Sequence, residues 1–172
     1  MKNPHITNSV ARGKASSKLV WNIFADRPWV LTVVETKQNS IEDAQGFDMF
    51  VKVVNLFGSV LKLDGKDNVL SVQIKSSDRS VREFFHKYSK HKRFFNQVDR
   101  CHQFILCGME DSEVVMADIV GQIVAHANNF KLSEADVINF LNEVEDYEIV
   151  DAYKKYRILM LSRWYGVHLP PL

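Results

Sequence analysis

The chain has few of the residues that interrupt or cross-link a fold. Only 7 glycines and 4 prolines occur in 172 residues, which excludes a loop-rich or low-complexity protein. The two cysteines, Cys101 and Cys107, lie on a segment that we predict to be helical. On a helix this spacing separates them by about 9 Å along the axis, too far for a disulfide. The sequence therefore indicates a reducing compartment, and we predict a cytoplasmic location.

Long apolar segments are also missing. No stretch approaches the roughly 18 uncharged apolar residues that cross a bilayer. The first residues lack the apolar centre of a secretory signal. The first acidic residue is Asp26, so an organellar transit peptide is the alternative to an uncleaved cytoplasmic N-terminus. We expect no membrane contact.

Sequence motifs of the common enzyme classes are absent as well. The chain contains no Walker A, G-x-G-x-x-G, G-x-S-x-G or H-E-x-x-H pattern. Histidines and cysteines gather over 86–107, but their spacing matches no standard zinc site. The acids over 143–148 suit a helix start, where carboxylates favour the positive end of the dipole. We therefore predict a non-enzymatic protein without metal or cofactor, and an enzyme whose site is assembled from scattered residues is the alternative.

Length and composition indicate one domain with an ordinary core. Of the 172 residues 46% are hydrophobic and 25% are charged, and two domains of half this length would each have a thin core. Residues 1–17 are polar and basic without a hydrophobic period. We predict an N-terminal arm there and a single domain over residues 18–172.

The first half of that domain carries strand patterns. Apolar runs over 19–24 and 29–36, rich in Val, Ile, Trp and Thr, predict a β-hairpin. Apolar residues at three- and four-residue steps predict a helix from about 40 to 65. Residues 69–75 alternate apolar and polar, which predicts a half-buried strand. The predicted fold class is α+β, with a small antiparallel sheet of about three strands and one packed helix.

The remaining sequence predicts a helical C-terminal half. Helices are expected over 79–107, from 112 onward, over 133–141 and over 148–165. A break near Ser89 would divide the first of these. Ser133 and Asp136 have the spacing of a capping box, with Asp in place of the usual Glu. The helix from 112 should bury one apolar stripe, formed by Val115, Ile119, Ile123 and Ala127.

Charge is strongly segregated along the chain, although the net charge is only +1. Residues 79–103 carry seven basic and two acidic side chains, whereas residues 104–153 carry one lysine and eleven acids. Segregation of this kind bears on partners rather than on fold. Acids in the predicted 133–141 helix would repel phosphates, so we do not expect this helix to read DNA as part of a helix-turn-helix.

A basic ridge is the sharpest functional signal in the sequence. If 79–107 is one helix, basic side chains recur every three or four residues along one face and could follow a phosphate backbone. Two phenylalanines off the apolar stripe could stack on unpaired bases. The predicted nucleic-acid-binding residues are Arg79, Arg82, His86, Lys90, Arg93 and Arg100, together with Phe85 and Phe94.

Two functions follow from these patterns. The first is a non-enzymatic accessory protein that binds nucleic acid, DNA or RNA, through the basic ridge. The alternative is a protein–protein interaction subunit of a homo-oligomer or larger assembly, joined through complementary acidic and basic surfaces. In that case the acidic 110–151 region would meet a basic protein partner. A core helix whose solvated face happens to be basic is the plain structural explanation of the ridge.

Overall fold

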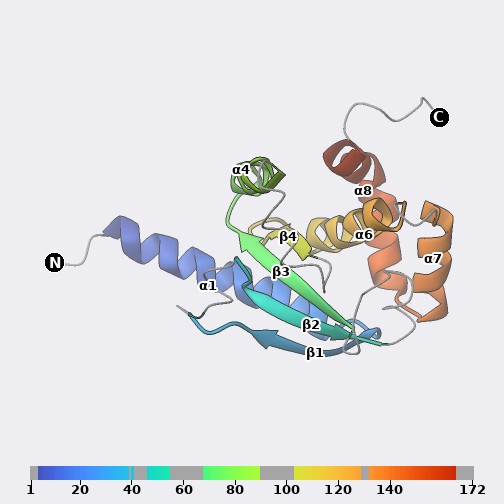
Figure 1. Ribbon diagram of the computed structural model, residues 1–172, viewed down its shortest axis with the longest axis horizontal. Helices are drawn as coiled ribbons and strands as arrows, with labels where there is room; N and C mark the ends of the chain where they lie inside the picture. The colour runs from blue at the N-terminus through green and yellow to red at the C-terminus, as the bar shows by residue number, and fades with distance from the viewer. Residues whose placement is uncertain are drawn as a thin grey trace.

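The structure, a computed structural model, describes residues 4–38, 40, 46–54, 68–89, 103–128 and 132–165. Within these residues five helices and one four-stranded sheet form an α+β fold with a helical C-terminal half, as predicted (Figure 1). The elements in chain order are α1 (Pro4–Ala25), β1 (Val30–Glu35), β2 (Met49–Val53), β3 (Val69–Lys75), α4 (Asp78–Ser89), β4 (Gln103–Cys107), α6 (Ser112–Asn128), α7 (Glu134–Glu143) and α8 (Tyr147–Tyr165).

The sheet has four strands in the order β1-β2-β3-β4, not about three. The first three strands are antiparallel, whereas β4 pairs with β3 in parallel. A parallel pair needs a crossover connection, and α4 lies in the connection between β3 and β4. The predicted purely antiparallel sheet is therefore wrong at its last strand, because β4 was assigned to a long helix.

The predicted hairpin over 19–24 and 29–36 is wrong in its first strand, because residues 19–24 end α1. Val20, Ile23 and Phe24 are buried, and their spacing of three and four residues places them on one side of a helix. A run of six residues of which five are apolar cannot distinguish this stripe from a strand. The second predicted strand is confirmed as β1.

The described part of the predicted N-terminal arm is helical and continuous with the buried end of α1. Figure 1 shows the start of this helix projecting away from the sheet. Buried Ser16 contacts the turn after β4 so closely that a Cβ added to Gly108 would lie 2.6 Å from the Cβ of Ser16. The predicted boundary at residue 17 thus falls inside a helix, and the division into arm and domain stays a prediction.

The helix predicted from about 40 to 65 is wrong where the structure describes it. Met49, Val51 and Val53 are buried on one face of β2, and Lys52 between them is exposed. This alternation is the period of a strand. Most of the remaining predicted helix lies outside the described residues.

Predictions based on strong local patterns are confirmed. Strand β3 has the predicted bounds but is not half-buried, because Ser71 and Gln73 on its polar face are buried as well; the stripe on α6 is fully buried. Ser133 caps α7 in a complete capping box, in which its side chain accepts a hydrogen bond from the backbone N–H of Asp136 and the Asp136 side chain accepts one from the backbone N–H of Ser133. The last helix is found as α8.

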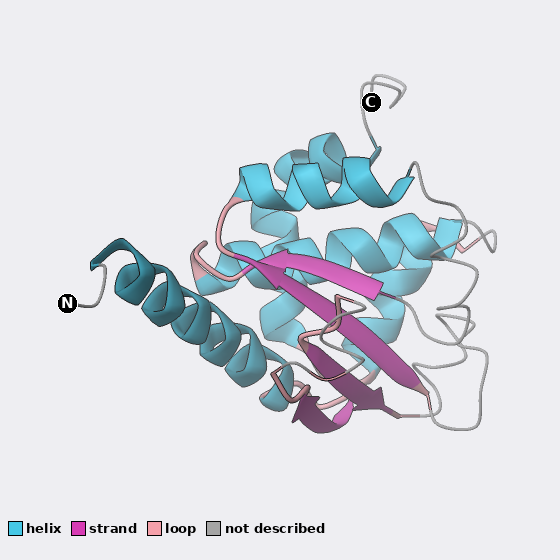
Figure 2. Cartoon of the chain, turned by 60° about the vertical axis from the view of Figure 1, so that its left-hand side comes forward, coloured by secondary structure: helices cyan, strands magenta, loops and turns pink. Residues whose placement is uncertain are grey.

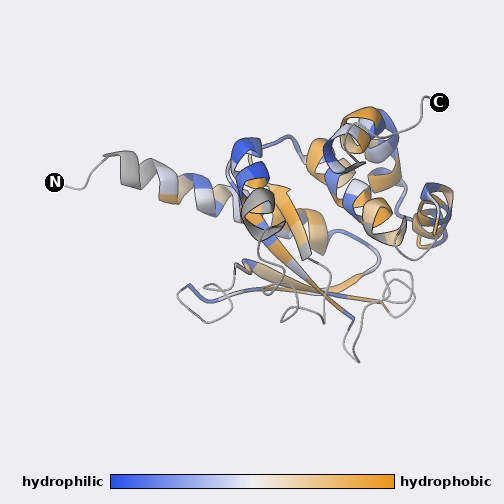
Figure 3. Cartoon of the chain, turned by 45° about the horizontal axis from the view of Figure 1, so that its top comes forward, coloured by the Kyte–Doolittle hydropathy of each residue, from blue (hydrophilic) through white to orange (hydrophobic). Residues whose placement is uncertain are grey.

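The main core lies between one face of the sheet and helices α1 and α6, and α8 packs along α6. Figure 2 shows the helical C-terminal half gathered behind the sheet. Phe104 and Leu106 of β4 point into this core, whereas Ile105 and Cys107 point to the opposite face. There they meet α4, whose ribbon is largely hydrophilic in Figure 3 beside largely hydrophobic strands.

A buried polar junction joins the two ends of the fold. The Asp146 carboxylate, just before α8, accepts hydrogen bonds from Arg27 Nη1 and Trp29 Nε1, both at 2.8 Å. Arg27 also donates to the Ile23 carbonyl oxygen at 3.0 Å and pairs with Glu148 at 2.6 Å. Arg27 is 6% exposed and Asp146 3% exposed, so this ion pair is shielded from water. The junction therefore ties the end of α1 and the start of β1 to the start of α8.

We predict that Arg27→Ala lowers the free energy of unfolding by about 3–5 kcal/mol, because it leaves the Asp146 carboxylate buried without its cation. Arg79 is the matched control, since it is a surface arginine paired within its own helix. Arg79→Ala should leave the unfolding midpoint nearly unchanged. Urea denaturation at neutral pH measures both variants. Equal losses in the two variants would contradict a structural role for the buried pair.

Candidate functional site

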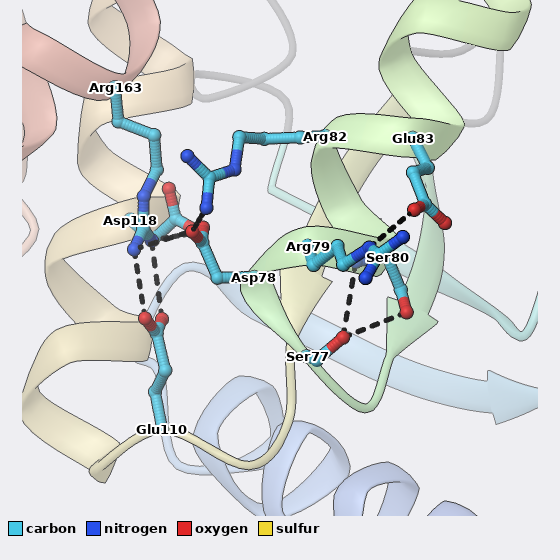
Figure 4. Close-up of polar contacts among 9 residues, drawn as sticks. All are labelled: Ser77, Asp78, Arg79, Ser80, Arg82, Glu83, Glu110, Asp118 and Arg163. Atoms are coloured by element: carbon cyan, nitrogen blue, oxygen red, sulfur yellow. Dashed lines mark hydrogen bonds and ion pairs between the residues drawn. The ribbon is translucent and has the colours of Figure 1, made fainter.

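Two of the predicted nucleic-acid-binding residues, Arg79 and Arg82, lie in the first turns of α4, and Figure 4 shows their side chains extending toward Glu83 and Asp78 respectively. The side chains of Arg79 and Arg82 are 86% and 76% exposed. Each is paired within the helix, Arg79 with Glu83 and Arg82 with Asp78, both at 2.7 Å. This start of α4 thus presents two guanidinium groups to solvent, each beside one carboxylate.

The other predicted ridge residues are not placed by side-chain geometry. The backbone of Phe85 and His86 is part of helix α4, but the side chains of both residues lie outside the described part of the structure. Residues Lys90, Arg93, Phe94 and Arg100 lie outside the described residues altogether. The single helix predicted over 79–107 is wrong, because its last residues form β4. Whether the helix breaks near Ser89 stays a prediction, because the residues that follow α4 lie outside the described ranges.

Helix α4 is held on the sheet by a cap and a small apolar cluster. Ser77 caps it by accepting a hydrogen bond from the Ser80 backbone N–H at 3.1 Å. Val81 and Phe84 pack on the outer face of β4, where they form a small hydrophobic cluster with Ile105 and Cys107. Burial there raises the pKa of the Cys107 thiol. The exposed arginines therefore lie on a helix that is packed against the sheet in a defined position.

An ion-pair network that the sequence did not reveal lies beneath the start of α4 (Figure 4). Arg163, in the last turn of α8, makes a bidentate pair with Glu110 at 2.8 and 3.2 Å. The same guanidinium reaches Asp118 of α6 at 3.3 Å and Asp78 of α4 at 3.5 Å. No local pattern could have found the network, because its members come from distant parts of the chain.

Asp118 is the most perturbed carboxyl group of this network. It is 1% exposed, and burial raises its pKa to about 7, against the opposing effects of Arg163 and of a hydrogen bond from the Trp164 indole. Helices α6 and α8 approach each other closely beside Asp118, since a Cβ added to Gly121 of α6 would lie 3.0 Å from the Met160 Cβ of α8. A carboxyl group sealed in this way can hold or release a proton, but it does not face a ligand from solvent. We assign it to the packing of α6 against α8.

Much of the acidic charge of residues 104–153 is neutralised inside the fold. Arg157 of α8 makes a bidentate contact with Glu134, at 2.5 and 2.8 Å, which lowers the pKa of that carboxyl. Lys155 of α8 pairs with Glu113 of α6 at the surface, where both side chains are exposed. Charges that are segregated along the sequence therefore recombine in three dimensions. A basic partner for the 110–151 region stays a prediction.

No family model, no curated protein and no solved structure matches the chain. Its function must therefore be argued from its own residues. Among the described residues, no three His, Cys, Asp or Glu side chains come together in a way that would hold a metal ion. Nor does any helix in the described ranges have the length and apolar character needed to cross a membrane.

The two outer strands of the sheet differ in how their backbone is protected. The Gln122 side chain of α6, itself buried, binds the backbone of Ile105 in β4 at both its N–H (3.0 Å) and its C=O (3.1 Å). Strand β1 has β2 on one side and no described strand on the other. Its Leu31 and Val34 are 59% and 55% exposed. Among the described residues this edge of β1 is open, and it is therefore a second candidate site, which the predicted hairpin had concealed.

We predict that Asp118→Asn flattens the pH dependence of stability. The folded pKa of about 7 lies above the ordinary value near 4, so the folded state binds more protons than the unfolded state in that window. Stability from this group is present below about pH 4 and is lost as pH rises to about 7, by roughly 4 kcal/mol in total. Denaturant unfolding from acid to neutral pH measures this loss as the difference between the two proteins. Parallel curves would show that Asp118 is not perturbed.

Proposed function

We propose that this chain is an interaction subunit that binds another protein chain through the open edge of β1. The observation that carries the proposal is the exposed, largely uncharged strand Val30–Glu35 at the border of the sheet (Figure 1). An edge of this kind is a template for pairing with a further strand. Main-chain hydrogen bonds then supply affinity, and alternate side chains supply specificity.

The register of the sheet indicates which backbone groups are available on this edge. The Thr36 N–H donates to the Asp48 carbonyl oxygen at 3.0 Å, in line with the ladder between β1 and β2. In an antiparallel pair, hydrogen-bonded and non-hydrogen-bonded positions alternate. The N–H and C=O groups of Val34 therefore point toward β2, whereas those of Val33 and Glu35 point away from it. These two residues are the binding groups of the proposed interface.

Protection against edge pairing is sparse along this stretch. Edge strands are commonly blunted by lysine, proline, a bulge or a covering element. Strand β1 has one bulge, between Val30 and Thr32, and one charge, Glu35 at its end. The residues between them are apolar or hydroxylated. The opposite edge of the sheet is covered at Ile105 by Gln122, whereas the β1 edge has no strand or side-chain cover among the described residues.

We predict that a fluorescein-labelled peptide with the sequence of residues 29–37 binds the chain, measured by fluorescence anisotropy. Val33→Pro should weaken this binding about tenfold or more, because it removes an outward N–H and places a ring on the edge. The internal ladder does not use this N–H, so the thermal unfolding transition should persist. Val33→Ile is the matched control, which keeps the N–H and an apolar β-branched side chain. Equal binding by both variants, or none by the wild type, would remove the edge from consideration.

A second candidate function is the binding of nucleic acid by α4. The observation that favours it is the exposure of Arg79 and Arg82, which pair, within the described part of the chain, with carboxylates of their own helix. Surface pairs of this kind contribute little, so phosphates could replace the carboxylates. The half-buried Arg163 network would then fix the position of α4 through Asp78.

For this second candidate we predict that labelled single- or double-stranded DNA or RNA binds the chain with an affinity that falls between about 50 and 200 mM salt. Neutralising Arg82, Lys90 and Arg93 to Gln should lower the slope of log affinity against log salt by about 1 for each lost phosphate contact. A control with Lys18, Lys52 and Lys154 changed to Gln loses the same net charge. Equal weakening in both triple variants would indicate nonspecific attraction rather than a site on α4.

A further inference from the structure

We infer that the partner of the open β1 edge is a second copy of this chain, paired antiparallel about a two-fold axis at Val34. This inference rests on the proposed function and specifies its partner. Isologous pairing requires a surface that is complementary to itself under a two-fold rotation. Strand β1 meets this requirement best when the axis passes through Val34, and less well when it passes through a neighbouring residue.

Hydrogen bonding selects the register. Val33 and Glu35 direct their backbone groups away from β2, and with the axis at Val34 each lies opposite the other residue in the second copy. Both outward-facing residues of each copy then exchange hydrogen bonds. The bulge between Val30 and Thr32 stays outside these bonds. The two sheets would become one continuous sheet.

Side chains on the exposed face agree with this register. Val34, 55% exposed in the single chain, would lie directly opposite Val34 of the second copy. This is a non-hydrogen-bonded position, where opposite side chains approach most closely. Thr32 would lie opposite Thr36 of the second copy on each side of the axis. Paired β-branched residues flanked by threonine pairs are favourable cross-strand neighbours.

Neighbouring registers are poorer. An axis at Val33 would require Leu31, beside the bulge, to pair with Glu35 of the second copy. An axis at Glu35 would place two carboxylates directly opposite each other, which is destabilising. It would also use the Lys37 carbonyl oxygen, which already accepts a hydrogen bond from the Ser40 N–H at 3.0 Å. With the axis at Val34, the two carboxylates are not opposite each other, and the pairing needs neither Leu31 nor the Lys37 carbonyl oxygen.

The decisive experiment uses opposite charges at the axis. Val34→Lys and Val34→Glu each place like charges opposite one another and should convert the wild-type dimer to a monomer, measured by size-exclusion chromatography with light scattering. An equal mixture of the two variants should recover the dimer, because lysine then faces glutamate. Val34 is exposed, so neither change enters the core. Recovery in the mixture also shows that both variants are folded.

Cross-linking gives an independent readout of the same register. Opposite residues at a non-hydrogen-bonded position lie about 4.5 Å apart at Cα, within the range of a disulfide. Val34→Cys should therefore form a covalent dimer under a glutathione redox buffer. Thr32→Cys is the matched control, because its two copies would be offset by about 13 Å along the strands. The wild type serves as the blank for Cys101 and Cys107.

The outcomes separate this inference from the function on which it rests. A monomeric wild type, or dimers that persist in both charge variants, would overturn the second copy as partner. If the 29–37 peptide still binds such a monomer and Val33→Pro abolishes that binding, the edge accepts an added strand without pairing with a second whole copy, and the proposed function stands. If the peptide also fails to bind, both fall together.

Discussion

The rest of the structure depends on the buried carboxylate of Asp146. A carboxylate in the protein interior costs several kcal/mol unless a cation and hydrogen-bond donors compensate it. Arg27 and Trp29 supply these groups from residues 119 and 117 positions away in the chain. Since Arg27 follows α1 and Trp29 precedes β1, the junction determines where the N-terminal elements meet the start of α8. The sheet and α6 are then enclosed between elements whose ends are joined.

The same requirement, that buried or strand-edge polar groups find partners, distinguishes the two borders of the sheet. At β4 the amide of Gln122 replaces a neighbouring strand for Ile105, so that edge needs nothing from outside. At β1 the start of the strand is anchored through Trp29, but the groups of Val33 and Glu35 point outward. Water can satisfy them, and so can another strand. The exposed Leu31 and Val34 favour pairing with another strand over contact with water, because removing apolar side chains from water lowers the free energy.

Charges that are segregated along the chain meet one another in the fold. The blocks of opposite sign along the chain suggested separate basic and acidic surfaces. In the fold, Arg157 and Arg163 of α8 neutralise Glu134 and Glu110, so a large part of the acidic block is internally paired. On α4 the two placed arginines also have carboxylate neighbours. The charge counted along a stretch of sequence therefore exceeds the unpaired charge at the protein surface whenever helices from distant parts of the chain form ion pairs with that stretch.

The sequence by itself determined the elements whose signals are long or chemically specific: the alternation of β3, the apolar stripe of α6, the capping box at Ser133 and the helix α8. It also identified Arg79 and Arg82 as neighbours on one helix face. Tertiary structure alone decided the short apolar runs at 19–24, 49–53 and 103–107, because five or six residues bury equally well as helix or strand until their neighbours are known. It alone created the Arg163 network and the open edge of β1. Both depend on which distant segments become neighbours, and no local spacing encodes that.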